Sequence, residues 1–199
     1  MTAARRATQA RTTKETDIRL TLNLDGEGEA QVSTGIGFFD HMLTAFARHG
    51  LFDLEVQVKG DLEVDAHHTV EDTGLVLGAA VRTALGDKES IARFGAAHVP
   101  MDESLVLAAV DLSGRPYFAF AGFTFDVPAV GGFDTPLAEE FFRAFASEAR
   151  CNLHLRCLAG GNAHHMIEAA FKAVGRALRA AVERDPRVKG VPSTKGVLV

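Results

Sequence analysis

The feature that most constrains the fold of this chain is a five-residue motif that occurs twice. His67–Glu71 reads His-His-Thr-Val-Glu, and almost 100 residues later His164–Glu168 reads His-His-Met-Ile-Glu. Two adjacent histidines followed by a carboxylate at this spacing are unusual even once. Two copies in similar surroundings of a 199-residue chain indicate duplicated half-domains that build a metal centre together.

The pattern of apolar residues predicts the same order of elements in both halves. Alternation from Ile18 to Leu24 is typical of a half-buried strand, and each motif opens a stretch with the apolar face of a long helix. We therefore expect an α+β fold of duplicated half-domains, each a four-stranded antiparallel or mixed sheet with two helices on one face. The halves can pack helix layer to helix layer or sheet to sheet. The first half is predicted to hold strands 18–24, 29–33, 52–58 and a short 62–64, with helices 38–48 and 66–85; the second holds strands 105–111, 116–120 and 151–158, with helices 137–149 and 163–183.

The segments between these elements set the predicted domain boundaries. Residues 86–100 join the halves, and residues 123–136, rich in Gly and Pro, are predicted to be an irregular connection. The expected division is a flexible N-terminal tail at 1–14, half-domains at 15–90 and 91–185, and a mobile C-terminal tail or lid at 186–199.

Composition excludes several classes of protein. The net charge of −5 argues against a general nucleic-acid-binding surface. No apolar stretch approaches the ~18 residues of a membrane span, and the N-terminus has no signal-peptide pattern. Cys151 and Cys157 match no zinc or redox motif, so we expect two half-buried thiols, in a reducing cytoplasm.

Helix geometry limits how each motif can bind metal. Residues i and i+1 point about 100° apart, whereas i, i+3 and i+4 share a face. The two histidines of one motif therefore cannot easily reach the same ion, and each motif is predicted to serve two different ions. Imidazole and carboxylate together suit Mn, Fe or Zn.

The repeat extends the set of ligands. The shorter predicted helix of each half carries His41 in the first half and Glu140 in the corresponding place in the second. An ordinary solvated charge at a helix start is the alternative for Glu140. Two six-coordinate ions would keep positions for water or substrate, as catalysis requires. The eight predicted ligands are His41, His67, His68, Glu71, Glu140, His164, His165 and Glu168.

Other polar residues are candidates for contacts with a ligand. Arg93, Arg115, Ser193 and Lys195 stand in Gly- or Pro-rich contexts and could form a phosphate cradle, although each alone is more often a solvated surface residue. His49, at the end of the first short helix, could also line a site.

The chain resembles the imidazoleglycerol-phosphate dehydratases, a family of histidine-biosynthesis enzymes. The resemblance covers nearly the whole sequence. The motifs that carry it are Arg11–Thr16, Phe39–Leu43, Ala66–Asp72, Asp111–Pro116, His164–Ala169 and Pro192–Gly196.

The resemblance implies a fold, an assembly and a set of site residues. It implies a ribosomal protein S5 domain 2-like fold in each half, a homo-oligomer of 24 subunits with active sites between subunits, and two Mn(II) ions per site. The family's metal ligands fall on the eight residues above, with Glu140 where many relatives carry His. Its substrate contacts fall on Glu15, His41, His49, His67, Arg93, Arg115, His164, Ser193 and Lys195.

The implied reaction converts D-erythro-imidazole-glycerol phosphate into imidazole-acetol phosphate and water, through an imidazolate that bridges the two metals. Glu71, Glu168 or Glu15 could move the protons, and the tail with Lys195 could close over the phosphate. Two alternatives share these residues: a dinuclear metallohydrolase of a phosphate ester, and a non-catalytic metal-binding cage protein. Neither nucleic acid nor membrane is expected as a partner.

Overall fold

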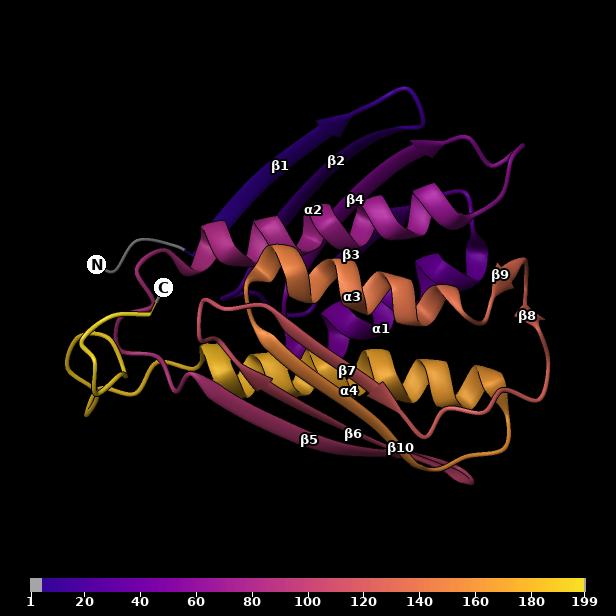
Figure 1. Cartoon of the computed structure of the whole chain (residues 1–199). Coiled ribbons are helices and arrows are strands. Elements are labelled where there is room, and N and C mark those ends of the chain that lie inside the picture. The colour runs from indigo at the N-terminus through magenta and orange to yellow at the C-terminus, as the bar shows by residue number, and fades with distance from the viewer. Residues whose placement is uncertain (1–4, 199) are drawn as a thin grey trace.

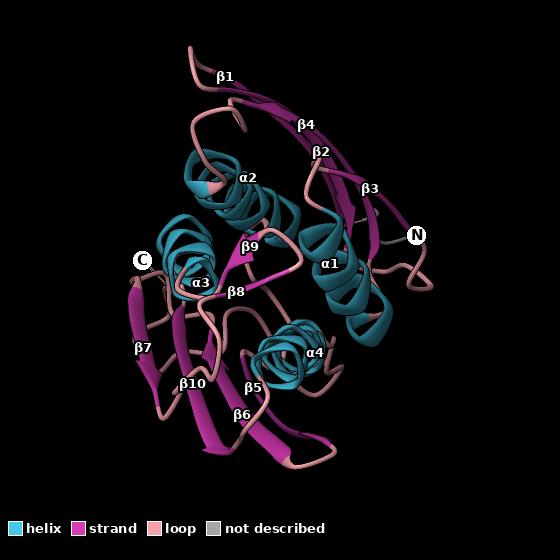
Figure 2. Ribbon diagram, turned by 90° about the vertical axis from the view of Figure 1, so that its right-hand side faces the viewer, coloured by secondary structure: helices cyan, strands magenta, loops and turns pink. Residues whose placement is uncertain are grey.

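The computed structural model describes residues 5–198 and places four helices between two four-stranded sheets (Figures 1 and 2). The first half contains β1 (Arg6–Thr12), β2 (Thr16–Asn23), β3 (Ala30–Ser33), α1 (Gly37–Gly50), β4 (Asp53–Gly60) and α2 (His67–Leu85). The second half contains β5 (Phe94–Met101), β6 (Ser104–Asp111), β7 (Tyr117–Ala121), the short hairpin β8 (Ala129–Val130) and β9 (Phe133–Asp134), α3 (Leu137–Ala149), β10 (Asn152–Ala159) and α4 (Ala163–Val182).

The two sheets have the same topology, which confirms the predicted duplicated half-domains. The strand orders are β1-β2-β4-β3 and β5-β6-β10-β7. In each sheet the last strand runs parallel to its neighbour, and the other pairs are antiparallel. Ile18, Leu20 and Leu22 alternate with more exposed residues along β2 and face the helices, as their spacing predicts.

The halves pack helix layer to helix layer, so each helix pair takes one helix from each half. Helix α1 packs on α4, and α2 packs on α3 (Figure 2). Both contacts depend on a glycine: a Cβ on Gly78 would lie 2.4 Å from the Phe145 carbonyl oxygen, and one on Gly175 would lie 2.5 Å from that of Phe46. These two contacts occupy the same place in the repeat, so the helix layer has an approximate twofold relation.

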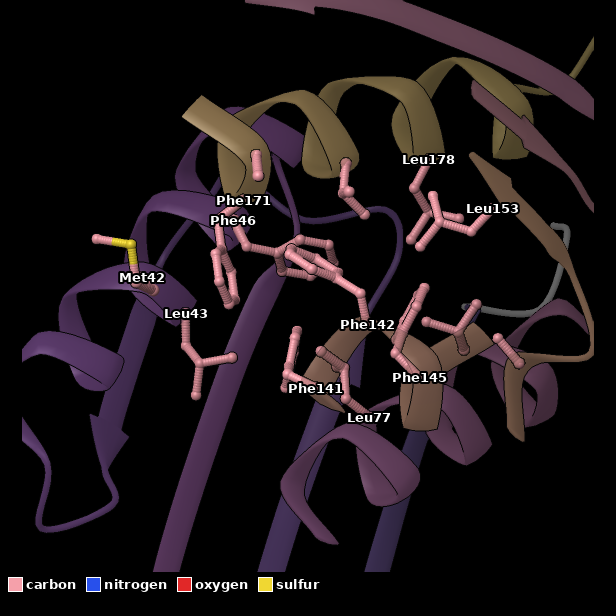
Figure 3. Close-up of a cluster of buried hydrophobic side chains, with 14 of the residues drawn as sticks. Met42, Leu43, Phe46, Leu77, Phe141, Phe142, Phe145, Leu153, Phe171 and Leu178 are labelled. Carbon is pink, nitrogen blue, oxygen red and sulfur yellow. The ribbon is translucent and has the colours of Figure 1, made fainter. Parts of the chain in front are cut away.

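Aromatic side chains fill the centre of this layer. Phe141, Phe142 and Phe171 are buried with ring centroids 4.6–5.1 Å apart, and they come from α3 and α4 (Figure 3). Each such side chain stabilises the fold by about 1.5–3 kcal/mol through burial. Phe39 of α1 joins them with its ring centroid 5.4 Å from that of Phe141, so the core is shared between the halves.

Three predictions about the connections are wrong. The flexible tail expected at 1–14 is wrong for Arg6–Thr12, which pairs with β2 along its whole length as β1; residues 1–4 lie outside the described part. The strand expected at 62–64 is a turn with exposed Leu62 and Val64. Much of the connector at 86–100 is the edge strand β5. The sequences of β1 (RATQART) and β5 (FGAAHVPM) lack a regular alternation of large apolar residues, which is why these two strands escaped detection.

Candidate active site

Three side chains with metal-binding chemistry meet near the starts of α1 and α4. The Nε2 atoms of His41 and His164 lie 3.2 and 3.0 Å from one oxygen, Oε2 of Glu168. One donor atom from each residue falls within 4.8 Å of the others. His164 and Glu168 share a face of α4, and the packing of α1 on α4 adds His41. His41 therefore joins the motif of the other half and not the motif of its own.

Glu168 is held as a carboxylate although its side chain is only 8% exposed. Burial raises its pKa, but a 2.6 Å ion pair with Lys172 Nζ and the two histidine contacts outweigh burial and lower the pKa. The charged form is the one that binds metal. Lys172 was not predicted as a site residue, although its position four residues after Glu168 was visible in the sequence.

The first motif opens α2 in the corresponding way. His67 Nε2 lies 3.7 Å from Glu71 Oε2, the counterpart of the contact between His164 and Glu168. Both side chains are close to half exposed. The rings of His67 and His68 are 85° apart and those of His164 and His165 are 79° apart, so adjacent histidines diverge as helix geometry predicts.

The second histidine of each motif contacts carboxylates from outside the motif. His68 Nδ1 lies 2.9 Å from Asp61 Oδ2, and its Nε2 lies 3.8 Å from Glu15 Oε1. His165 Nδ1 lies 2.9 Å from Glu103 Oε2. The hydrogen bonds that the histidines donate to Asp61 and Glu103 raise the pKa of the two histidines, and the one from His165 lowers the pKa of Glu103 to about 2. No sequence pattern marked Asp61 or Glu103: both lie in turns outside the motifs, Asp61 seven residues before His68 and Glu103 62 residues before His165.

Glu140 belongs to none of the groups of three metal-binding donors found among residues 5–198. It lies in the first turn of α3 and its Oε2 is 3.6 Å from Arg143 Nε. Among residues 5–198 the groups of three such donors are His41–His164–Glu168 and Asp102–Glu103–His165, and neither includes Glu140. Helix α3 packs on α2, which carries the first motif, as α1 packs on α4.

The predicted phosphate-binding residues lie partly together. Arg93 Nη1 donates to the Pro192 carbonyl at 2.9 Å, which places Arg93 beside the Ser193 segment. The same guanidinium pairs with Asp111 at 2.7 and 3.2 Å. The Lys195 amide donates to Ser193 Oγ at 3.2 Å. Arg115 lies in the turn after β6, where its amide donates to Ser113 Oγ at 3.2 Å.

Within one chain, the predicted phosphate-binding residues lie far from the predicted metal ligands. The Arg93 amide donates at 2.8 Å to the Ala181 carbonyl in the last turn of α4, whereas His164 lies in its first turn. At about 1.5 Å per residue, roughly 25 Å of helix separates the two groups. Figure 1 shows the C-terminal segment at the end of the helix layer opposite the β10–α4 connection.

His49 lies between these extremes, in the last turn of α1. Burial lowers its pKa, and the positive charges of Lys172 and Arg176 lower it further. The positive charges of Lys172 and Arg176 near this ring are compatible with contact to an anion. His154, on β10, is exposed, and its ring centroid lies 5.4 Å from that of Tyr117.

The fold and the paired histidine–carboxylate groups define a duplicated α+β protein with the ligand chemistry of a metal-dependent enzyme. Within residues 5–198, no helix is long and apolar enough to cross a membrane. A family model described as imidazoleglycerol-phosphate dehydratase matches residues 34–178. The chain belongs to this family of histidine-biosynthesis hydro-lyases.

Individual relatives and solved structures agree with the family model. The chain is 59% identical to the imidazoleglycerol-phosphate dehydratase of Acetivibrio thermocellus over 95% of this chain and 96% of the relative. It is 59% identical to that of Gluconobacter oxydans over the full length of both. The crystal structure of the Staphylococcus aureus enzyme matches with a TM-score of 0.82 and 39% identity, over 90% of this chain and 99% of the other. That of the Pyrococcus furiosus enzyme matches with a TM-score of 0.81 and 42% identity, over 96% and 100%.

Proposed function

We propose that this protein catalyses the Mn(II)-dependent dehydration of D-erythro-imidazole-glycerol phosphate to imidazole-acetol phosphate in the cytoplasm. Family membership supports the reaction class. The observation that carries the proposal is the buried Glu168 carboxylate with two imidazoles, from His41 and His164, on one of its oxygens. This group unites residues from both halves of the repeat.

The donors present fit a divalent ion such as Mn(II). Imidazole nitrogen and carboxylate oxygen are ligands that Mn(II), Fe and Zn accept, and no thiol lies in either three-donor group of residues 5–198. Two ions per active site, when bound, would act as Lewis acids that favour the deprotonated form of the substrate's imidazole ring. The residues that would hold them are His41, His67, His68, Glu71, Glu140, His164, His165 and Glu168.

We place the complete active site between copies of this chain. The separation of Arg93 from His164 along α4 supports this, because the substrate is too short to span ~25 Å. One copy would supply metal ligands, and a neighbour would supply Arg93, Arg115, Ser193 and Lys195 for the phosphate. A homo-oligomer follows, and 24 subunits are expected from the family resemblance. Residues 186–199 would close over the phosphate as a lid.

The three candidate carboxylates differ in how available they are for proton transfer. Glu168 is committed to Lys172 and two histidines, so it is the least available of the three candidates. Glu15 has a side chain that is 53% exposed and sits 3.8 Å from His68 Nε2. We therefore assign the principal proton transfer to Glu15 and a secondary role to Glu71. Among the candidate substrate contacts, His49 and Arg93 would bind the phosphate, and His67 would lie beside the ring.

The test is turnover of the substrate by the purified protein with added Mn(II). We expect imidazole-acetol phosphate to form without release of inorganic phosphate, and His165→Ala to lose metal and activity together. Phosphate release would indicate a metallohydrolase. Mn(II) binding without either product, and without an increase in melting temperature on adding a triazole-bearing phosphate analogue, would indicate a metal-binding cage protein.

A further inference from the structure

The second histidine of each motif is hydrogen bonded to one carboxylate, and the histidine atom is Nδ1 in both motifs. Asp61 Oδ2 and Glu103 Oε2 each lie 2.9 Å from a histidine Nδ1, that of His68 and that of His165. An ionised carboxylate can only accept a hydrogen bond, so Nδ1 carries the proton and Nε2 keeps its lone pair. A metal-bound histidine is commonly oriented by such a second partner.

We propose that Asp61 and Glu103 are positioning residues that orient Nε2 of His68 and of His165 toward the metal ions. Because Glu103 is held in this role, it is not available for proton transfer, whereas its counterpart Glu15 is. The proposal rests on the proposed function, since it concerns the same ions. It assigns different roles to two carboxylates that occupy one position of the repeat.

The repeat itself identifies the counterparts. Glu15 directly precedes β2, the second strand of the first half, and Glu103 directly precedes β6, the second strand of the second half. Asp61 directly follows β4, and the residue that directly follows β10 is Gly160. The second half therefore lacks a carboxylate where the first half has Asp61.

Packing explains why the second half needs a different residue. A Cβ at Gly160 would lie 2.4 Å from Met166 Sδ and 2.9 Å from Cys157 Sγ, so a side chain at this position has no room. Glu103 reaches His165 from the turn between β5 and β6. In the first half Asp61 already holds His68, which leaves the turn residue Glu15 free.

The hydrogen bonds of the two turn residues differ accordingly. Glu103 Oε1 accepts from Ser104 Oγ at 2.8 Å and from the Asn162 amide at 3.0 Å, while Oε2 accepts from His165. Every oxygen of Glu103 is engaged. For Glu15 the contact within residues 5–198 is the longer one, 3.8 Å to His68 Nε2.

The experiment compares Mn(II) affinity and turnover in the assembled protein. Glu103→Gln and Asp61→Asn keep the size of the side chain and remove its charge. We expect each to weaken Mn(II) binding by about 10- to 100-fold, measured by electron paramagnetic resonance of free Mn(II). Turnover should recover when Mn(II) is raised to saturation. Glu15→Gln should bind Mn(II) within about twofold of wild type and stay inactive at saturation.

A matched control separates positioning from folding. Asp53 begins β4, at the end opposite Asp61, and accepts from the Glu27 and Glu29 amides at 2.8 and 3.2 Å, so Asp53→Asn should lower the melting temperature and leave Mn(II) affinity unchanged. Wild-type affinity in both Glu103→Gln and Asp61→Asn would overturn the proposal. So would a loss of affinity in Glu15→Gln equal to theirs. If the wild type bound Mn(II) but dehydrated nothing, and the two variants still lost affinity, the proposed function would fail and the positioning roles would stand.

Discussion

At the scale of single residues, environment decides what a side chain of one type can do. Glu168 is buried and tied to a lysine, Glu103 is exposed but fully hydrogen bonded, and Glu15 is exposed and loosely held. The sequence could place Glu168 by its spacing from His164. It could not distinguish the two turn residues, because their partners come from distant segments. Resemblance to the family was the source for Glu15.

The cysteines provide a prediction at this scale. Burial raises the pKa of Cys151 to about 12 and also raises that of Cys157. Reaction requires the thiolate, and a raised pKa together with burial reduces the accessible thiolate at pH 8 for both residues. We expect no labelling by a chromogenic disulfide reagent at pH 8 in the native protein and two thiols labelled in urea. Rapid labelling of the folded protein would contradict the burial of these residues.

At the scale of elements, the contacts between helices determine which site residues meet, and the helix propensity of a single segment does not. Alternation and helical periodicity predicted both long helices, both short helices and the central strands β2, β4, β6 and β10. They also predicted the edge strands β3 and β7 but failed for the edge strands β1 and β5, whose sequences lack a regular alternation of large apolar residues. Nor could they show that α1 would meet α4, because contacts between the halves leave no local pattern. That meeting is what brings His41 to Glu168.

Gly78 provides a prediction for the helix contacts. Its added Cβ would lie 2.4 Å from the Phe145 carbonyl and 2.8 Å from the Ala149 amide nitrogen, both backbone atoms of α3. Gly78→Ala should therefore lower the free energy of unfolding by about 1–3 kcal/mol, measured by urea denaturation. Gly37→Ala is the control, because nothing lies within 4 Å of a Cβ at Gly37. Equal stability of the two variants would mean that α2 and α3 are less closely packed.

The strand β1 provides a second prediction for an element. Removal of residues 1–12 would leave the edge of β2 that pairs with β1 without a partner, and it would expose the core that Ala7 covers. We expect a lower melting temperature and a tendency to aggregate, because the new edge can pair with other chains. A truncated protein with the wild-type melting temperature would restore the prediction of a flexible tail.

At the scale of the whole molecule, the two ends of the helix layer carry different parts of the proposed site. The histidines lie at one end, and Arg93 with the segment from Pro192 to Lys195 lies at the other. The sequence contained all of these residues but not their separation, because that depends on the length of α4 and on the direction in which β5 returns along it. The separation makes the neighbouring copy a functional necessity in the proposed enzyme.

Complementation between inactive variants tests this necessity. His164→Ala and Lys195→Ala should each be inactive alone. Co-assembled in equal amounts, they should regain about a quarter of wild-type activity, because random mixing gives that share of sites two intact contributions. Activity of separately purified and unmixed samples is the baseline. No recovery in verified mixed oligomers would place the whole site within one chain.

Each helix pair contains one helix from each half, and this arrangement bears on how the chain evolved by duplication. A half-length ancestor would have left its helix layer uncovered, and two copies related by a twofold axis could have covered each other with the contacts that Gly78 and Gly175 now make. Such an ancestor would have been a dimer, because a single copy would expose the apolar face of its helices. Fusion of the two genes freed the copies from identity, and one position could then become Asp61 while its twin became Gly160.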